Sequence, residues 1–195
     1  MRHFVYFSES AQTSGNFKTD NLMKAGRMDI VMHTIINVFF LSHTPREDVK
    51  LHLVFYGQPD PPKHIEIQIK PELDISKKDI ANLIKKILYK YKEGKKTEVF
   101  PGCFVEKRSF LKVVEELIEE GKDIFVLDKK GKNLRSVKIS KEPVFIIGDH
   151  EGLPKKELKR LKKLAVPVSV GKKVYFASQV VTIINNELDL REESP

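Results

Sequence analysis

The stretch PVFIIGDHEGLP (143–154), with PVSVGKKVYFAS (167–178) and QVVTIINNELDL (179–190) after it, decides the fold of this chain. It predicts a strand, a glycine-bearing loop, a second strand, a second glycine-bearing loop and a helix. Glycine after an apolar run favours a turn and ends the strand. The last third of the chain is therefore expected to be α/β.

The two predicted strands of this stretch end in the same way. The apolar run Val144–Ile147 stops at Gly148, and Val166–Val170 stops at Gly171. Parallel strands that end in glycine loops expose backbone N–H and C=O groups side by side, and open α/β sheets bind ligands at such carboxyl ends. The sequence therefore predicts a small-molecule site at these loops.

The rest of the chain supports an alternating α/β arrangement. Strands and helices are predicted in turn, so we expect a largely parallel sheet with helices on both faces and no second autonomous domain. The predicted strands are 4–7, 51–56, 64–69, 124–127, 144–147 and 166–170. The predicted helices are 29–42, 76–92, 109–120, the basic stretch 155–164 and the final segment.

Finer expectations concern the segments between these elements. The alternating stretch 64–69 is expected near a sheet edge, and 97–105 is expected to be irregular or extended. Residues 129–140 predict a turn or a hairpin. Ser76 is the expected N-cap of its helix, because serine caps helix starts well.

Composition limits the class of protein. The chain has 195 residues, of which 41% are hydrophobic, enough for a globular core. No apolar run approaches the ~20 residues that span a membrane. One cysteine, Cys103, allows no internal disulfide, so we expect a cytoplasmic protein and a packed thiol. The six histidines lack zinc-ligand spacing, and no metal site is expected.

The net charge of +8 favours a polyanionic partner. Residues 155–164 hold six basic residues and one acid, and 85–96 form a second basic stretch. If the first stretch is a helix, Leu158, Leu161 and Leu164 fall on one face of it. The alternative is a pair of solvated helix faces, but the net excess of positive charge favours nucleic acid. The sequence has no RNA-binding motif that would indicate which class of nucleic acid binds.

Several common chemistries are excluded by missing motifs. The sequence has no G-x-G-x-x-G after a strand, no G-x-x-x-x-G-K-[ST] and no G-x-S-x-G. A glycine-loop pocket with apolar walls suits a neutral or cationic ligand that carries an adenine. The residues alone therefore indicate an α/β binding or transferase domain that acts on RNA.

Five phrases of the sequence carry a family resemblance. They are FFLSH (39–43), LVFYGQPDPP (53–62), FPG (100–102), FIIGDHEG (145–152) and TIINNELD (182–189). Together they resemble the archaeal tRNA pseudouridine N1-methyltransferases, which belong to the SPOUT class of trefoil-knotted methyltransferases. The resemblance covers nearly the whole chain.

The resemblance implies a fold and a cofactor. It implies one SPOUT domain over 1–195, with a C-terminal trefoil knot and cofactor site within roughly 124–190. S-adenosyl-L-methionine would sit in the knot, held mainly by backbone groups of the two glycine loops. The implied cofactor-binding residues are Leu127, Gly148, Val170, Gly171, Lys172, Lys173, Val174, Tyr175 and Val180.

The resemblance also implies catalytic and substrate residues near the N-terminus. The family has an acid six residues before a Gly-Arg-hydrophobic-Asp segment, which here makes the acid Asp20 and the arginine Arg27. Asp20 is the implied acceptor of the N1 proton, and the alternative is a loop-capping aspartate. Arg27 suits a phosphate or a carboxylate, and the alternative is a salt bridge to Asp29 or to a helix elsewhere.

One departure from the family lies where the final helix begins. Many members have His-Cys where this chain has Gln179-Val180. Val180 can only pack, so either the thiol is dispensable or the rate or substrate is altered. Gln179 can still hydrogen-bond a base edge, which makes it a candidate substrate contact.

The implied function is N1-methylation of pseudouridine 54 in the T loop of tRNA. The alternatives are the same chemistry on ribosomal RNA, or a non-catalytic RNA-binding or assembly factor that keeps the knot fold. A homodimer is expected, because C₂ dimers are common and the apolar residues of the last helix exceed one narrow stripe. These residues are Val181, Ile183, Ile184 and Leu188.

Overall fold

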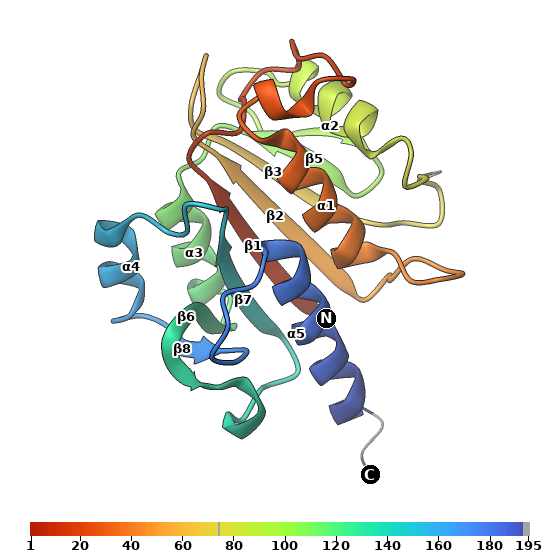
Figure 1. Ribbon diagram of the computed structural model, residues 1–195. Helices are drawn as coiled ribbons and strands as arrows, with labels where there is room; N and C mark the ends of the chain where they lie inside the picture. The colour runs from red at the N-terminus through yellow and green to blue at the C-terminus, as the bar shows by residue number, and fades with distance from the viewer. Residues whose placement is uncertain (74, 193–195) are drawn as a thin grey trace.

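The computed structural model describes residues 1–73 and 75–192, and these form an eight-stranded sheet with helices on both faces (Figure 1). The strands are β1 (Arg2–Ser8), β2 (Val49–Phe55), β3 (Lys63–Gln68), β4 (Thr97–Phe100), β5 (Cys103–Glu106), β6 (Asp123–Asn133), β7 (Pro143–Gly148) and β8 (Val166–Ser169). The helices are α1 (Met28–Phe39), α2 (Ile80–Tyr89), α3 (Phe110–Glu119), α4 (Lys155–Leu161) and α5 (Ala177–Glu192). Two 3₁₀ turns, Leu22–Lys24 and Leu134–Ser136, complete the list.

The sheet has a parallel half and an antiparallel half. Its order is β4-β5-β3-β2-β1-β7-β6-β8. Strands β2, β1, β7, β6 and β8 pair in parallel, as expected, and β3, β5 and β4 extend the sheet in antiparallel pairs. The strands β7 and β8 are not neighbours, because β6 lies between them. The two glycine loops nevertheless leave the same edge of the sheet.

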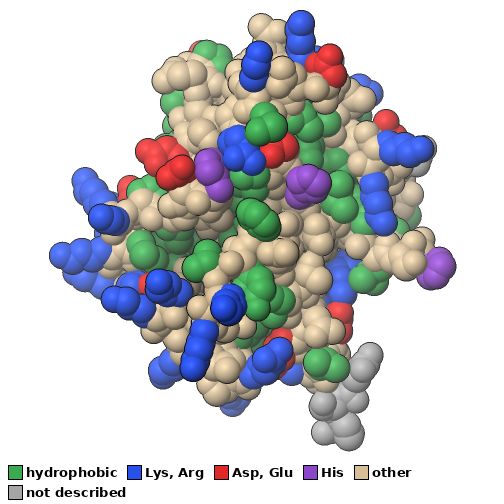
Figure 2. Space-filling model, in the orientation of Figure 1, with side chains coloured by type: hydrophobic (Ala, Val, Ile, Leu, Met, Phe, Trp, Pro, Cys, Tyr) green, Lys and Arg blue, Asp and Glu red, His purple; other side chains and the backbone are tan. Residues whose placement is uncertain are grey.

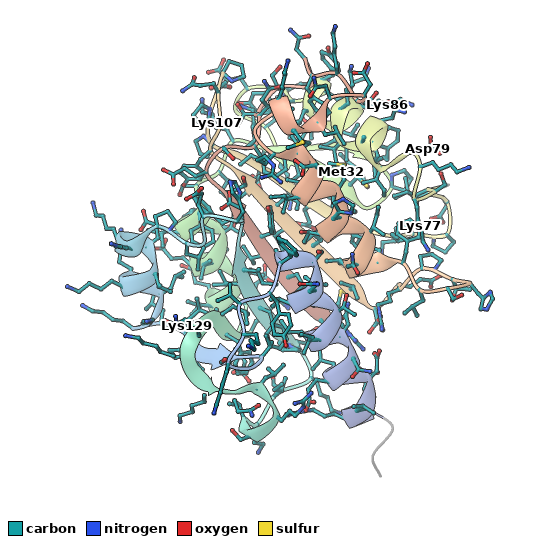
Figure 3. All side chains as sticks on the ribbon, in the orientation of Figure 1. Met32, Lys77, Asp79, Lys86, Lys107 and Lys129 are labelled. Carbon is teal, nitrogen blue, oxygen red and sulfur yellow. The ribbon has the colours of Figure 1, made fainter. Side chains whose placement is uncertain are left out.

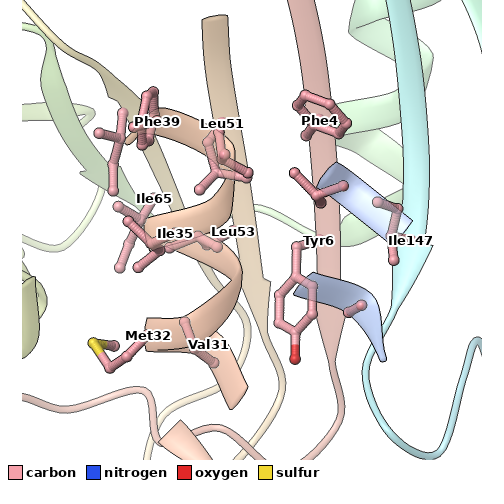
Figure 4. Packing of buried hydrophobic residues seen from close by; sticks show 14 of the residues in the cluster. Phe4, Tyr6, Val31, Met32, Ile35, Phe39, Leu51, Leu53, Ile65 and Ile147 are labelled. Carbon is pink, nitrogen blue, oxygen red and sulfur yellow. The ribbon is translucent and has the colours of Figure 1, made fainter. Parts of the chain in front are cut away.

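The two faces of the sheet alternate along each strand. On β1, Phe4 and Tyr6 face α1 and α5, whereas Val5 and Phe7 face α3. This alternation is the period of a strand whose two faces are both buried. Figure 4 shows the first face, where α1 packs against β2 and β3 while β1 and β7 lie under α5. The expectation of helices on both faces is confirmed.

Helix α5 buries most of its apolar residues in this chain's own core. Val181, Ile184 and Leu188 are buried, and Ile183 is half-buried. Helix α1 is its main packing partner, and Thr182 Oγ1 donates to Asn37 Oδ1 at 2.9 Å. The apolar excess of this helix is therefore largely accounted for within one chain.

Two helix boundaries differ from the sequence-based expectation. Helix α1 ends at Phe39 instead of 42, because Phe40 forms a β-bridge with Pro45. Helix α2 begins at Ile80, and Ser76 is not its N-cap. The Ser76 hydroxyl instead donates to Asp79 Oδ2 at 2.5 Å, within a turn that precedes the helix.

Pairing partners explain the differences among the strands. The segment 64–69 is not at an edge, since residues 97–106 form the hairpin β4–β5 and β5 pairs with β3. The expected turn or hairpin after 129 is instead a continuation of β6, which bulges after Leu127 and pairs again with β8 at Lys132 and Asn133.

The basic helix is also shorter than expected. Helix α4 ends at Leu161, which is fully buried, while Leu164 lies in the following turn with 53% of its surface exposed. The three leucines therefore do not share one buried face.

The described residues contain neither a membrane-spanning helix nor a cluster of metal-ligating side chains. None of the helices in 1–73 and 75–192 is long and apolar enough to cross a membrane. Within the same residues, no group of three or more His, Cys, Asp or Glu side chains is placed to hold a metal ion.

Candidate active site

A pocket of about 360 Å³ opens at the carboxyl ends of β6, β7 and β8. Its walls come from the ends of these strands, the two glycine loops, α4 and the first turn of α5. The lining residues are Leu127, Asp128, Lys129, Ile147, Gly148, Asp149, Gly152, Leu153, Leu158, Val168, Ser169, Val170, Gly171, Lys173, Val174, Tyr175, Ala177 and Val180. The pocket therefore lies where the two glycine loops predicted it.

The chemistry of the walls suits a nucleoside-like ligand. Aliphatic side chains from three strands and α5 give flat apolar surfaces, as at Leu127, Ile147 and Val180. The glycine loops add backbone donors and acceptors. A pocket within the common range of ~300–1,000 Å³ with apolar walls and a few polar groups is typical of a cofactor site. S-adenosylmethionine, with an adenine and a cationic sulfonium, fits this set of groups.

Gly148 is required by a close approach within its own loop. A Cβ on Gly148 would lie 2.4 Å from the carbonyl carbon of Gly152 and 2.6 Å from the Leu153 nitrogen. A side chain at this position would therefore clash with the backbone of the loop itself. Gly171 differs: a Cβ there would meet no atom within 4 Å, but its φ of 150° favours glycine.

Asp149 ties the loop after β7 to the loop after β1. Its carboxylate accepts hydrogen bonds from Ser8 Oγ at 2.8 Å, from the Glu9 N–H at 3.2 Å and from the Glu151 N–H at 2.9 Å. Because three donors hold one buried carboxylate, the ends of β1 and β7 are fixed against each other. The first-loop region is thereby held at the edge of the sheet that carries the pocket.

The structure brings most of the expected cofactor residues together. Eight of the nine line the pocket: Leu127, Gly148, Val170, Gly171, Lys173, Val174, Tyr175 and Val180. Lys172 does not line it, and its side chain is exposed. The role of all nine residues in binding the cofactor stays a prediction.

Sequence reasoning missed several lining residues. Asp128, Ser169 and Ala177 belong to the pocket but were not among the expected cofactor residues. Asp149 was visible as the residue after Gly148 at a strand end, which is a position where polar side chains often meet ligands. No local signal in the sequence marks Leu158, since it reaches the pocket from α4.

Asp20 lies in an exposed turn and outside the pocket lining. Its carboxylate makes no hydrogen bond or ion pair with any residue in the described part of the chain. The 3₁₀ turn that follows has Asn21 at its N-cap position with no side-chain cap. The loop-capping alternative therefore has no hydrogen bond to support it.

Arg27 adopts a left-handed conformation, with φ 61°, directly before α1. Its guanidinium binds Asp29 in a two-pronged ion pair, with Nε–Oδ1 at 3.0 Å and Nη2–Oδ2 at 2.9 Å. The Arg27 hydrogen bonds lower the pKa of the Asp29 carboxyl. The salt-bridge alternative is thus observed, and 38% of the Arg27 side chain remains exposed.

The start of α5 carries the family departure. Gln179 Oε1 accepts a hydrogen bond from the Phe176 N–H at 3.0 Å, so this side chain caps its own helix. Gln179 is exposed and does not line the pocket. Val180 faces the pocket and is buried.

Two buried groups of the sheet have raised pKa values. The Tyr6 hydroxyl is buried beside α5 and has no hydrogen-bond partner among the described residues (Figure 4). Burial, reinforced by the Asp149 and Asp29 carboxylates, raises its pKa. Cys103 is fully buried in β5, and burial raises its pKa to about 12, which fits a packed thiol.

Comparison with known proteins places the whole chain in one family. Residues 1–193 match the family described as "Putative SAM-dependent RNA methyltransferase". The tRNA (pseudouridine(54)-N(1))-methyltransferase of Thermococcus gammatolerans is 34% identical over 203 residues, covering 100% of both chains. The protein of the same name from Methanocaldococcus jannaschii is 34% identical over 200 residues, covering 97% of each.

A solved structure shares the fold. The crystal structure of Archaeoglobus fulgidus Nep1 bound to S-adenosylhomocysteine superposes with a TM-score of 0.66 and covers 99% of both chains. The two sequences are 14% identical, so this likeness concerns the fold alone.

Proposed function

The chain belongs to this family of SAM-dependent RNA methyltransferases, and we propose that it methylates N1 of pseudouridine 54 in the T loop of tRNA. The observation that carries the proposal is similarity over the full chain, at 34% identity, to enzymes with that name. The pocket at the ends of β6, β7 and β8 is its site for S-adenosyl-L-methionine.

S-adenosylmethionine supplies an electrophilic methyl group on a sulfonium. In this proposal the backbone of the glycine loops and the apolar side chains Leu127, Ile147 and Val180 hold the adenosine part. Positioning alone provides much of the rate, since a fixed in-line approach replaces a random encounter. When bound, the cofactor would donate its methyl group to N1, and this chain would have to supply a group that takes the N1 proton.

Asp20 is the proposed acceptor of that proton. Its support is an exposed carboxylate without a partner among the described residues, in the loop region that follows β1. That region interlocks with its neighbours: Ser10 Oγ donates to the Gly26 carbonyl at 3.0 Å, and the Gly57 N–H donates to the Ala11 carbonyl at 3.1 Å. The loop that holds Asp20 therefore begins and ends on the edge of the sheet that carries the pocket.

Arg27 and Gln179 are the proposed contacts to the RNA. Arg27 keeps exposed guanidinium surface beyond its pair with Asp29, and Gln179 keeps its side-chain N–H₂ free of the described residues. A guanidinium suits a phosphate, and an amide suits a base edge. Val180 supplies packing against the cofactor in place of a thiol.

The C-terminal knot and the single domain are part of the same proposal. All eight strands belong to one sheet, which supports one domain over 1–195. Arg191 at the end of α5 donates to the carbonyls of Leu134 and Val137, at 3.0 and 2.9 Å, and so fastens this helix to the β6–β7 connection. Such a contact is what a helix threaded through that connection would make.

A homodimer completes the proposal. The loop from Val174 to Phe176 is an exposed apolar run beside the pocket, with 84% of Val174 and 69% of Phe176 exposed. Exposed apolar patches of this kind mark interaction surfaces. A second copy of the chain that covers this loop would also close the pocket from that side.

Methyl incorporation tests the function directly. Labelled S-adenosylmethionine is incubated with a T-loop stem that carries either uridine or pseudouridine at position 54. We expect label only in the pseudouridine RNA, at N1. Equal labelling of both RNAs, or labelling of a ribosomal pseudouridine hairpin alone, would contradict the proposed substrate.

A further inference from the structure

A group of basic side chains lies on the elements that form the α4 and β6 sides of the pocket. We name this group the basic rim. It consists of Lys129, Lys130 and Lys132 of β6, Lys155, Lys156, Lys159, Arg160 and Lys163 of α4 and the turn after it, and Lys172 and Lys173 of the β8–α5 loop. Figure 2 shows Lys and Arg side chains projecting over α4 and below it.

The rim is placed by the pocket itself. Lys129 and Lys173 line the pocket, as does Leu158, so α4 stands at the pocket wall. Leu161 is fully buried and anchors this helix against the core. The basic side chains of α4 therefore stand at a defined position beside the cofactor site.

The side chains of the rim are unpaired within the residues that the structure describes. None of its ten side chains forms an ion pair or hydrogen bond with another residue of 1–73 or 75–192. Elsewhere many lysines are neutralised: Lys50 and Lys96 pair with Glu66, and Lys122 pairs with Glu142. The single acid of α4, Glu157, is half-buried. Lys162, directly after this helix, pairs with Asp128 and is not part of the rim.

We propose that the basic rim binds the phosphodiester backbone of the RNA substrate next to the target nucleotide. The proposal rests on the proposed function and names the surface that serves it. An array of uncompensated cations releases condensed counterions when it meets phosphates, which gives affinity without reading sequence. The RNA would then lie along α4 while the target base reaches the pocket between the rim and the loops after β1 and β7.

The alternative is a solvated basic face that only contributes net charge. The chain offers a matched control for it, because Lys86, Lys90, Lys92 and Lys95 are also exposed and unpaired within the described residues. They belong to α2 and the turn after it. Figure 3 shows Lys86 beside α2 and Lys129 near α4, on opposite sides of the molecule.

The experiment compares two fourfold variants of equal charge. The rim variant changes Lys155, Lys156, Lys159 and Arg160 to Gln and leaves the pocket-lining Lys129 and Lys173 intact. The control variant changes the four α2-side lysines to Gln. Binding of a full-length tRNA transcript with pseudouridine 54 is measured by fluorescence anisotropy from 50 to 300 mM salt, and cofactor binding is measured by calorimetry.

We expect the rim variant to bind this tRNA at least tenfold more weakly at 150 mM salt. The slope of log K against log salt should fall by about 3, since each lost phosphate contact removes roughly 0.7–0.9. The control variant should change affinity less than threefold, and both should bind S-adenosylmethionine as the wild type does. The rim variant should lose the same factor in affinity for RNA with uridine at position 54 as for RNA with pseudouridine there.

The outcomes separate this inference from the function beneath it. Equal losses of tRNA affinity in the two variants, or no loss in either, would overturn the proposed RNA binding by the basic rim. This holds even if the wild type methylates pseudouridine 54 normally. A wild type that binds tRNA through the rim but transfers no methyl group would instead overturn the proposed function and leave the rim standing.

Discussion

Single side chains decide whether methyl transfer is assisted by a base. We expect Asp20→Asn to lower the single-turnover rate by roughly 10²–10⁴, the usual contribution of general-base catalysis. The amide keeps the shape of the carboxylate but cannot take a proton. Cofactor affinity should be unchanged, because Asp20 does not line the pocket. The measurement is a rapid-quench assay with enzyme in excess over RNA.

A melting curve on the same sample provides the control for Asp20. Since this carboxylate makes no hydrogen bond with the described residues, the melting temperature should stay within about 1–2 °C of the wild type. A normal chemical step in Asp20→Asn would remove this residue from the mechanism. A lower melting temperature with normal turnover per folded molecule would restore its loop-capping interpretation.

Gly148 is a residue where packing within a loop overrides the simplest reading of the sequence. We expect Gly148→Ala to weaken cofactor binding at least tenfold and to lower stability by roughly 1–3 kcal/mol, because the new Cβ meets the Gly152 backbone at 2.4 Å. Gly121→Ala offers a contrast, since its Cβ would meet no atom within 4 Å: it should cost only the roughly 1–2 kcal/mol of a left-handed φ of 78° and leave cofactor affinity unchanged, because Gly121 does not line the pocket. Wild-type stability and cofactor affinity in Gly148→Ala would show that the loop is not closely packed.

Whole elements are joined by a row of buried histidines on the α3 face of the sheet. His3 of β1, His52 of β2 and His64 of β3 are linked at 3.4 and 3.0 Å, and His64 meets Glu106 of β5 at 3.0 Å. Burial, with help from Lys122 and Lys50, lowers the pKa of His3 to about 4, and burial lowers the pKa of His52 well below its ordinary value. His3 and His52 are therefore neutral at pH 7.

These lowered pKa values predict an acid-sensitive fold. An unfolded histidine titrates near pH 6.5. Between about pH 6.5 and 4, the unfolded chain therefore binds a proton that folded His3 does not. The free energy of unfolding should fall across this window, by up to about 3 kcal/mol from His3, and should fall no further from this group below pH 4. Urea unfolding at pH 7.5, 6.5, 5.5 and 4.5 measures the slope.

Two variants test whether the row causes this slope. His3→Asn should flatten the dependence between pH 6.5 and 4.5, because one lowered pKa is removed. His33→Asn should leave it unchanged, since His33 is exposed on α1. Parallel slopes in the wild type and His3→Asn would show that His3 does not cause the acid sensitivity.

The end of α5 is held to the β6–β7 connection by one guanidinium. Arg191 donates to the carbonyls of Leu134, Arg135 and Val137, at 3.0, 3.3 and 2.9 Å. We expect Arg191→Met to destabilise the fold by roughly 1–3 kcal/mol, because the stem still packs while three acceptors lose their donor. Arg135→Met should cost less than about 1 kcal/mol, because the Arg135 side chain is 69% exposed and water screens its pair with Glu187. Equal urea midpoints for both variants would show that the Arg191 hydrogen bonds do not stabilise the attachment of α5.

Local patterns predicted the elements well and their partners less well. The runs around Phe4, Leu51 and Val144 are buried strands, and their residues alone suffice to show it. The length of β6 could not be foreseen, because its exposed second half, after Leu127, is a strand only through pairing with β8. The hairpin β4–β5 was hidden for the same reason, since β5 depends on pairing with β3.

The pocket was predictable to the extent that it is built from strand ends. Glycine after an apolar run marked Gly148 and Gly171, and parallel strands end at one edge of the sheet. Residues such as Leu158 and Ala177 reach the same pocket from helices, through packing that no local pattern encodes. The roles of Asp20 and Arg27 came from the resemblance, because an exposed loop carries no such signal by itself.

At the level of the whole molecule, the exposed loop Val174–Phe176 bears on the oligomeric state. Within the described residues, the apolar face of α5 is buried against this chain's own core, so that helix alone gives little reason to dimerise. The loop before this helix favours a dimer, because Val174 is 84% exposed and Phe176 is 69% exposed beside the pocket. Isologous C₂ contact would place the same loop of both copies at or near the two-fold axis.

We therefore expect light scattering to return a dimer mass for the wild type at 10 µM. Phe176→Glu should give a monomer, since a charge buried without a partner at an apolar contact is costly. Met23→Glu, on an apolar residue that is 63% exposed but outside the pocket lining, should remain a dimer and controls for adding a surface charge. A folded Phe176→Glu monomer should also bind the cofactor more weakly, because a partner no longer covers the pocket. A monomeric wild type, or a dimer that Phe176→Glu leaves intact, would place this loop outside the interface.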